Sequence, residues 1–132
     1  MIYSNPAELG EPLGAYSHIA VSDGGLVSIA GQVGATRDGT VAEGDFPAQL
    51  VQTFENLKSA LASEGLQPSD LLQLTTYLVS ADDISIFYET RTKIFAELFP
   101  DGKYPPNTLL VVKRLVQPEL LVEISALAVK PS

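Results

Sequence analysis

Two apolar runs rich in β-branched residues lie near the start of the chain, in the segment YSHIAVSDGGLVSIAGQVG. They meet at Asp23-Gly24-Gly25, where glycine can adopt the positive φ of a tight turn. The segment therefore predicts a β-hairpin. A second turn signal, Asp38-Gly39, follows before the apolar pattern changes its period.

Helical spacing begins in the segment DFPAQLVQTFENLKSALASEGL, with apolar residues at Leu50, Phe54, Leu57 and Leu61. Asp45 is a suitable N-terminal cap, Pro47 suits the first turn, and Gly65 can end the helix. The run LLQLTTYLV after Pro68 predicts a mostly buried strand.

A second helix is predicted over ADDISIFYETRTKIFAELF, where one face carries Ile84, Phe87, Arg91, Ile94 and Leu98. Arg91 interrupts that apolar face. The acidic pair Asp82-Asp83 is predicted to cap this helix. Two further strands, TLLVVKR and LLVEISALAV, close the chain on either side of a turn at Gln117-Pro118.

This order of elements predicts an α+β fold in one domain over residues 1–132, since no linker or repeat divides the chain. Two strand-helix-strand units imply right-handed crossovers, which place both helices on the same face of a mixed sheet. The other sheet face is apolar and uncovered. We therefore expect copies of the chain to cover it and any functional cleft to lie between subunits.

Composition supports an oligomer and excludes several partners. Hydrophobic residues make up 45% of the chain and charged residues 18%, more apolar than a small monomer needs. A formal net charge of -8 repels nucleic acid and anionic lipid. No cysteine is present, which agrees with a reducing cytoplasm. The first residues contain neither a basic cluster nor a long apolar run, so we expect a soluble cytoplasmic protein with no membrane contact.

His18, the only histidine, has two interpretations. It could act as a general base near neutral pH, or it could be a hairpin histidine bonded to the backbone. No serine, cysteine or aspartate at a recognisable motif spacing accompanies it, which favours the second. One histidine without cysteine also predicts no metal site, and the glycine clusters fit neither a phosphate loop nor a dinucleotide fingerprint.

Glu123 lies in the middle of the apolar strand LLVEISALAV, where a charge is costly unless it is paired or faces a cleft. Strand alternation puts it on one face with Leu121, Ser125 and Leu127, and the more apolar opposite set should pack under the helices. Two roles stay open for Glu123: an inter-subunit salt bridge to Arg114 or Lys113, and a catalytic role.

Several motifs occur in the order and register of the Rid (YjgF) family of reactive intermediate deaminases, which the chain resembles over nearly its whole length. GAYSHIA resembles the family's Gly-Pro-Tyr-Ser entry, VSIAGQVG its strand ending in Ser-Gly-Gln, and ELLVEISALAV its terminal Val-Glu-Ile-Glu-Ala strand. The segment TFENLKSALASEGLQPSDLLQLTTYL resembles its first helix and following strand.

The resemblance implies a chorismate-mutase-like fold, with a mixed six-stranded sheet and two helices on one face. It also implies a homotrimer around a central β-barrel, with clefts between subunits. Deaminating members hydrolyse imines or enamines such as 2-aminoacrylate to the 2-oxo acid and ammonia, without a cofactor. An arginine there grips the substrate carboxylate, while a glutamate and backbone groups position the hydrolytic water.

Three positions match the family's site: Tyr16 falls on its cleft tyrosine, Gly31 on its backbone glycine and Glu123 on its glutamate. Three depart from it, because Ala30 replaces a serine, Thr92 an asparagine and Thr108 the arginine. Threonine cannot replace a planar guanidinium fork, although Lys103 could supply a point charge. The predicted site therefore has Glu123 as catalytic residue and, for substrate binding, Tyr16, Ala30, Gly31, Thr92, Asn107 and Thr108.

The expected function is that of a Rid-like hydrolase or deaminase acting on a small reactive imine, enamine or related metabolite other than ordinary 2-aminoacrylate. The alternative is a non-catalytic trimeric module that binds a small metabolite or has a regulatory role.

Overall fold

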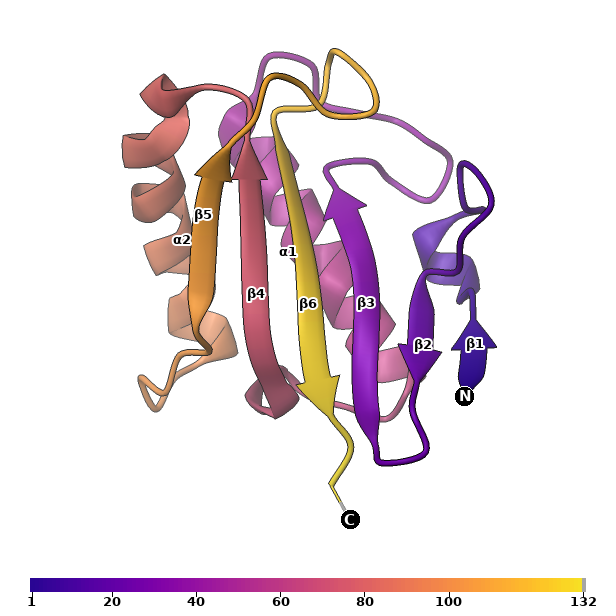
Figure 1. The fold of residues 1–132 in the computed structure, drawn as a ribbon. Coiled ribbons are helices and arrows are strands. Elements are labelled where there is room, and N and C mark those ends of the chain that lie inside the picture. Colours follow the sequence, from indigo (N-terminus) through magenta and orange to yellow (C-terminus); the bar gives the residue numbers. More distant parts are fainter. Residues whose placement is uncertain (132) are drawn as a thin grey trace.

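A computed structural model describes residues 1–131 of the chain. It contains one six-stranded sheet with the strand order β1-β2-β3-β6-β4-β5 (Figure 1). The strands are β1 (Ile2–Ser4), β2 (Ile19–Val21), β3 (Leu26–Val33), β4 (Leu71–Leu78), β5 (Asn107–Val111) and β6 (Val122–Val129). The helices are α1 (Phe46–Ser63) and α2 (Ile84–Leu98), with short 3-10 turns at Ala7–Leu9, Pro68–Asp70 and Ala81–Asp83.

The predicted hairpin is confirmed as β2 and β3, which pair antiparallel with Ile19 opposite Ile29. Gly25 has a φ of 86° and supplies the turn between them. The sequence pattern did not locate β1, which is three residues long and pairs with the edge of β2. Its exposed residues carry no apolar alternation that a pattern could detect.

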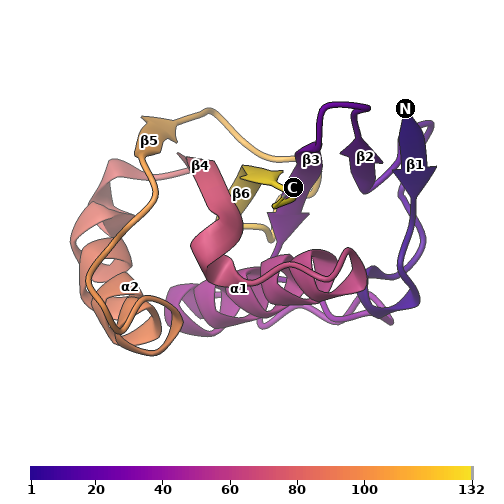
Figure 2. The ribbon, with the colours of Figure 1, turned by 90° about the horizontal axis from the view of Figure 1, so that it is seen from below.

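Helix α1 begins and ends where the sequence predicts. The side chain of Asp45 accepts a hydrogen bond of 3.0 Å from the backbone N–H of Ala48, and Gly65 has a φ of 73° just beyond the last turn. The apolar residues at helical spacing are all buried: Leu50, Phe54, Leu57 and Leu61. Both helices cover the same face of the sheet, as predicted (Figure 2).

Helix α2 differs in detail from the prediction. Its buried residues are Phe87, Thr90 and Phe95, while Ile84, Ile94 and Leu98 are only partly buried. The buried face turns toward α1, where the rings of Phe95 and Phe54 meet edge to face at 5.4 Å.

The cap of α2 is also different. Asp83 stands at the N-terminal cap position without a capping hydrogen bond from its side chain, so the predicted acidic cap is wrong in this respect. Ser80 instead accepts a hydrogen bond of 3.1 Å from the N–H of Asp82, which caps the preceding 3-10 turn.

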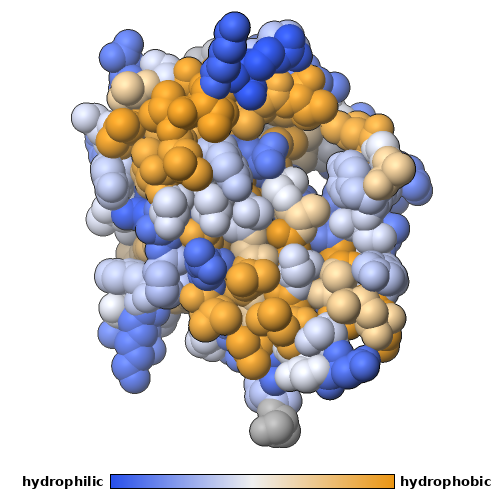
Figure 3. Space-filling model, in the orientation of Figure 1, coloured by the Kyte–Doolittle hydropathy of each residue, from blue (hydrophilic) through white to orange (hydrophobic). Residues whose placement is uncertain are grey.

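Strand β6 lies in the middle of the sheet and alternates as predicted. Val122, Ile124, Ala126 and Ala128 are buried beneath the helices. Glu123, Ser125 and Leu127 are half-buried on the opposite face, which we call the open face. Apolar patches gather toward both ends of this open face, with polar groups between them (Figure 3).

Neither helix in residues 1–131 has the length and apolar character needed to cross a membrane.

Candidate functional site

Glu123 is the charged residue in the middle of the open face. It lies in register with Val33 on β3 and Tyr77 on β4, so two strands flank its carboxylate. Burial raises the pKa of Glu123 above its ordinary value of 4.5, and within residues 1–131 no cation offsets that effect. A carboxylate in such surroundings is costly to keep charged, which is typical of groups that act on a ligand.

Gly31 provides the space that the Glu123 side chain occupies. The register between β3 and β6 shifts after Ile29, so that Ala30 and Gly31 both lie across from Ser125 in a β-bulge. A Cβ placed on Gly31 would lie 2.6 Å from Cδ of Glu123, closer than side chains can approach. The glutamate therefore lies directly against the backbone of Gly31, and only glycine allows this.

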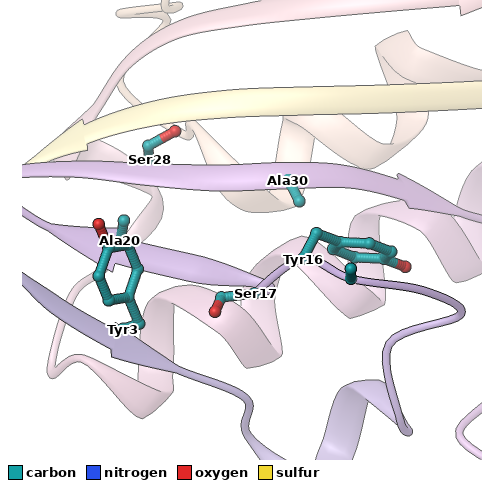
Figure 4. A pocket seen from close by; sticks show the side chains of 7 residues that line it. Tyr3, Tyr16, Ser17, Ala20, Ser28 and Ala30 are labelled. Atoms are coloured by element: carbon teal, nitrogen blue, oxygen red, sulfur yellow. The ribbon is translucent and has the colours of Figure 1, made fainter.

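Tyr16 and Ala30 border one open hollow of about 530 Å³ beside β2 and β3 (Figure 4). A second hollow of about 320 Å³ is lined by both Tyr16 and Gly31. Tyr16 is 45% exposed, and its hydroxyl accepts a hydrogen bond of 3.2 Å from the N–H of Leu13. Four predicted site residues thus lie together: Tyr16, Ala30, Gly31 and Glu123.

His18 is buried behind Tyr16, and both of its ring nitrogens have partners. Nδ1 accepts from the side-chain amide of Gln32 at 3.2 Å, and Nε2 donates to the carbonyl of Gly10 at 3.1 Å. These partners fit a neutral ring with its proton on Nε2. Gln32 also donates to the carbonyl of Ala30 at 3.1 Å. The structure therefore favours the second interpretation of His18, as a residue that holds the bulge in place.

Gln49 is a positioning residue that the sequence analysis missed. It is fully buried, donates to the carbonyls of Ala42 and Glu119 at 3.1 and 3.0 Å, and accepts from the N–H of Leu121 at 2.9 Å. These bonds fix the chain just before β6 and so the approach to Glu123. A polar residue next to Leu50 on the buried face of a helix was the available signal.

Thr92 and Asn107 lie in a different place, which we call the α2 cavity. Its volume is about 350 Å³, and it is lined by Tyr88, Arg91, Thr92, Phe95, Tyr104, Pro105 and Asn107. Asn107 accepts a hydrogen bond of 2.7 Å from the hydroxyl of Thr76, on the helix side of the sheet. The hydroxyl of Thr92 donates to the carbonyl of Tyr88 at 2.8 Å.

Thr108 is exposed on the open face of β5. It is in register with Thr75, which is in register with Ser125. Thr108 is thus two strands from the strand of Glu123, a separation of about 10 Å across the sheet at the usual spacing between neighbours. One chain therefore does not bring Thr92, Asn107 and Thr108 against Glu123.

Within residues 1–131 no three histidine, cysteine, aspartate or glutamate side chains gather in a way that could hold a metal ion.

The chain matches a known protein family. The family model described as "Endoribonuclease L-PSP" matches residues 7–130. The chain belongs to the Rid (YjgF) family. A RutC family protein of Aquifex aeolicus is 32% identical over 120 residues, which cover 90% of this chain and 91% of that protein. The 2-iminobutanoate/2-iminopropanoate deaminase of Salmonella typhimurium is 30% identical over 108 residues, or 81% of each chain.

Solved structures confirm the fold of this Rid-family chain. The YjgF gene product of E. coli superimposes with a TM-score of 0.88 at 23% identity, covering 99% of this chain and 100% of that one. E. coli TdcF with bound serine gives a TM-score of 0.87 at 24% identity, covering 99% of each chain. The expected chorismate-mutase-like fold, a mixed six-stranded sheet with two helices on one face, is therefore confirmed.

Proposed function

We propose that the protein hydrolyses a small reactive imine or enamine in clefts between subunits of a homotrimer, with Glu123 orienting the water. The observation that carries this proposal is the half-buried carboxylate of Glu123, which lies against the backbone of Gly31 without a cation. The names of relatives support it, since the protein from Salmonella typhimurium is a 2-iminobutanoate/2-iminopropanoate deaminase.

The chemistry needs a carboxylate and a water. The ionised carboxylate of Glu123 accepts a proton from water as the water oxygen bonds to the carbon of the C=N group. Glu123 returns that proton to the nitrogen, which leaves a neutral carbinolamine and the ionised carboxylate. The C–N bond then breaks as the proton of the carbinolamine hydroxyl passes to the amino nitrogen, so that ammonia leaves and a C=O group forms. An enamine substrate first shifts a proton from nitrogen to carbon and becomes the imine.

A trimer would complete this site. The open face is partly apolar, and it carries Leu26 of β3 and Leu110 of β5, which are 43% and 44% exposed. Covering this face with copies of the chain would remove it from water. The same assembly would bring the β5 edge of one subunit, with Thr92, Asn107 and Thr108, toward Glu123 and Gly31 of another.

Residue 108 sets the selectivity in this proposal. A threonine there offers one hydroxyl where other members place a guanidinium that grips the substrate carboxylate. Each hydrogen bond to a charged group contributes roughly 1.5 to 3 kcal/mol, so the loss of two such bonds weakens binding of small imino acids. The favoured substrate is thus a compound other than ordinary 2-aminoacrylate.

An RNA-cleaving activity, which the description of the family model names, is not favoured for this chain. The formal net charge of -8 repels a phosphate backbone. The only histidine is His18, which is buried with both ring nitrogens engaged and cannot reach a phosphodiester.

The test generates imines and enamines in situ from a panel of amino acids with a pyridoxal-phosphate enzyme. Trapping with semicarbazide then measures how fast each disappears with and without the protein. The proposal expects faster loss of at least one compound with wild type, together with stoichiometric ammonia. Glu123→Gln, which keeps the shape without the charge, should remove that acceleration. No acceleration for any compound, with tight metabolite binding instead, would indicate the non-catalytic module.

A further inference from the structure

Arg91 is a half-buried guanidinium without an anionic partner among residues 1–131. Its Cζ lies 4.8 Å from the ring centroid of Phe87, 4.9 Å from Tyr88 and 5.3 Å from Phe95. The three rings contact the guanidinium through cation–π interactions, and the N–H groups at its edges can still donate hydrogen bonds to a ligand. Arg114 provides a contrast, because its side chain donates to the carbonyls of Leu115 and Val116.

The α2 cavity is where a ligand would meet these edges, since Arg91 lines it. Asn107 uses its side-chain oxygen to accept from Thr76, so its amide N–H groups are available to a ligand. The cavity of about 350 Å³ falls within the usual range for small-molecule sites.

Part of the wall of the α2 cavity is flat and apolar. The rings of Phe95 and Tyr104 stack with centroids 5.8 Å apart and planes 24° from parallel, and Pro105 continues this surface. The guanidinium of Arg91 is half-buried, and this burial lowers the pKa of Arg91. A charge-assisted hydrogen bond gains strength in such surroundings.

We propose that the α2 cavity binds a small organic carboxylate with a flat apolar body, and that Arg91 grips the carboxylate. This inference rests on the proposed function in one respect, because it takes the bound carboxylate to be that of the imine substrate. The substrate carboxylate is then bound by a residue of helix α2 instead of a residue of strand β5. Thr92, a predicted site residue, follows Arg91 directly in the chain. A substrate with an aromatic body fills this cavity, whereas 2-aminoacrylate has no apolar body to place against the rings.

The probe is phenylacetate, with phenylacetamide as its neutral counterpart of the same shape. Binding of both is measured by titration calorimetry on the full-length protein. Wild type should bind phenylacetate about tenfold or more tightly than phenylacetamide, as expected when one charge-assisted hydrogen bond distinguishes them. Equal affinities for the two compounds, or no binding of either, would overturn the inference.

Variants separate binding from packing. Arg91→Met keeps an apolar stem over the rings and should weaken phenylacetate binding about tenfold or more, without changing phenylacetamide binding. The phenylacetate affinity of Arg91→Lys should lie between those of wild type and Arg91→Met, because lysine keeps the charge but lacks the planar guanidinium. Lys93→Met is the matched control, since Lys93 is exposed on the same helix and lines another hollow. Unchanged phenylacetate binding in Arg91→Met would mean that Arg91 only packs against the rings.

Failure of this site and failure of the proposed function give different results. Imine hydrolysis that depends on Glu123 but has the same KM for aromatic imino acids in Arg91→Met overturns the α2 site and leaves the function standing. Phenylacetate binding that depends on Arg91, in a protein that hydrolyses no imine, supports the site and contradicts the function.

Discussion

The carboxylate of Glu123 on β6 occupies the space where a side chain at Gly31 on β3 would begin. The two residues lie on neighbouring strands, at a β-bulge that places Ala30 and Gly31 on the same open face. Gly31 thus leaves room for the carboxylate of Glu123. It is not required for a turn, since its φ is not positive.

Gly31→Ala should move the Glu123 carboxylate and lower imine hydrolysis about 100-fold, because misplacing a catalytic group by about 1 Å can cost that much. Gly24→Ala is the control, since the nearest atom to a Cβ there is the Ser22 hydroxyl at 3.9 Å. Steady-state rates on one accepted imine decide the matter. Equal activity of Gly31→Ala and wild type would show that Glu123 does not need its present position.

Glu123 should make stability depend on pH in a particular direction. Burial raises its pKa in the folded state above the ordinary value of 4.5. Between these two values the folded protein binds more protons than the unfolded chain, so stability falls as the pH rises. The cost of the buried Glu123 charge to stability is complete when the pH is above the pKa of the folded state, and it is absent when the pH is below 4.5.

Glu123→Gln should consequently be more stable than wild type near pH 7, and this advantage should shrink as the pH falls toward 4. Urea unfolding at fixed protein concentration measures the difference at each pH. An advantage that stays constant or grows as the pH falls would contradict the assigned burial of the charge.

Thr108→Arg should raise activity on imino acids with a free carboxylate, because a guanidinium binds the carboxylate and fixes the reacting carbon relative to the water. Thr108→Lys should give a smaller gain, since a point charge lacks the planar fork. The measurement is kcat/KM for 2-aminoacrylate. Wild-type turnover as fast as that of an arginine-bearing member of the family would refute the role given to residue 108.

Light scattering of the wild-type protein should give about three times 14.1 kDa. Leu110→Lys, which places a charge on the open face of β5, should dissociate the trimer. Val51→Lys on α1 is the matched control and should leave the trimer intact. The two side chains are similarly exposed in one chain, Val51 at 46% and Leu110 at 44%. A stable wild-type monomer at micromolar concentration would remove the basis for a site between subunits.

Local patterns predicted most of the fold. The hairpin turn at Gly25, the cap at Asp45 and the facing of Glu123 each depend on a few neighbouring residues, and each is confirmed. Strand β1 was missed because three residues at an edge carry no period. The apolar face predicted for α2 left out Phe95, which is buried because it contacts Phe54 of α1.

The site was predictable only in part, because its residues come from distant segments. The match to family motifs indicated Tyr16, Ala30, Gly31 and Glu123, which the fold brings together. The buried bonds of Gln49 depend on the segments at Ala42 and Glu119 meeting beside α1, which no local pattern shows. Phe87, Tyr88 and Phe95 lie three or four residues from Arg91 in α2, so helical spacing could have indicated that Arg91 lies among three aromatic rings.

A crystal structure of the assembled protein with a bound 2-oxo acid product tests the central claim most directly, since the claim is that two subunits complete one site. We predict a homotrimer in which the ligand contacts Glu123, Gly31 and Tyr16 of one subunit. The same ligand should approach Thr92, Asn107 and Thr108 of the neighbour. A structure in which Thr108 and Glu123 share no cavity, either within a chain or across an interface, would contradict the account.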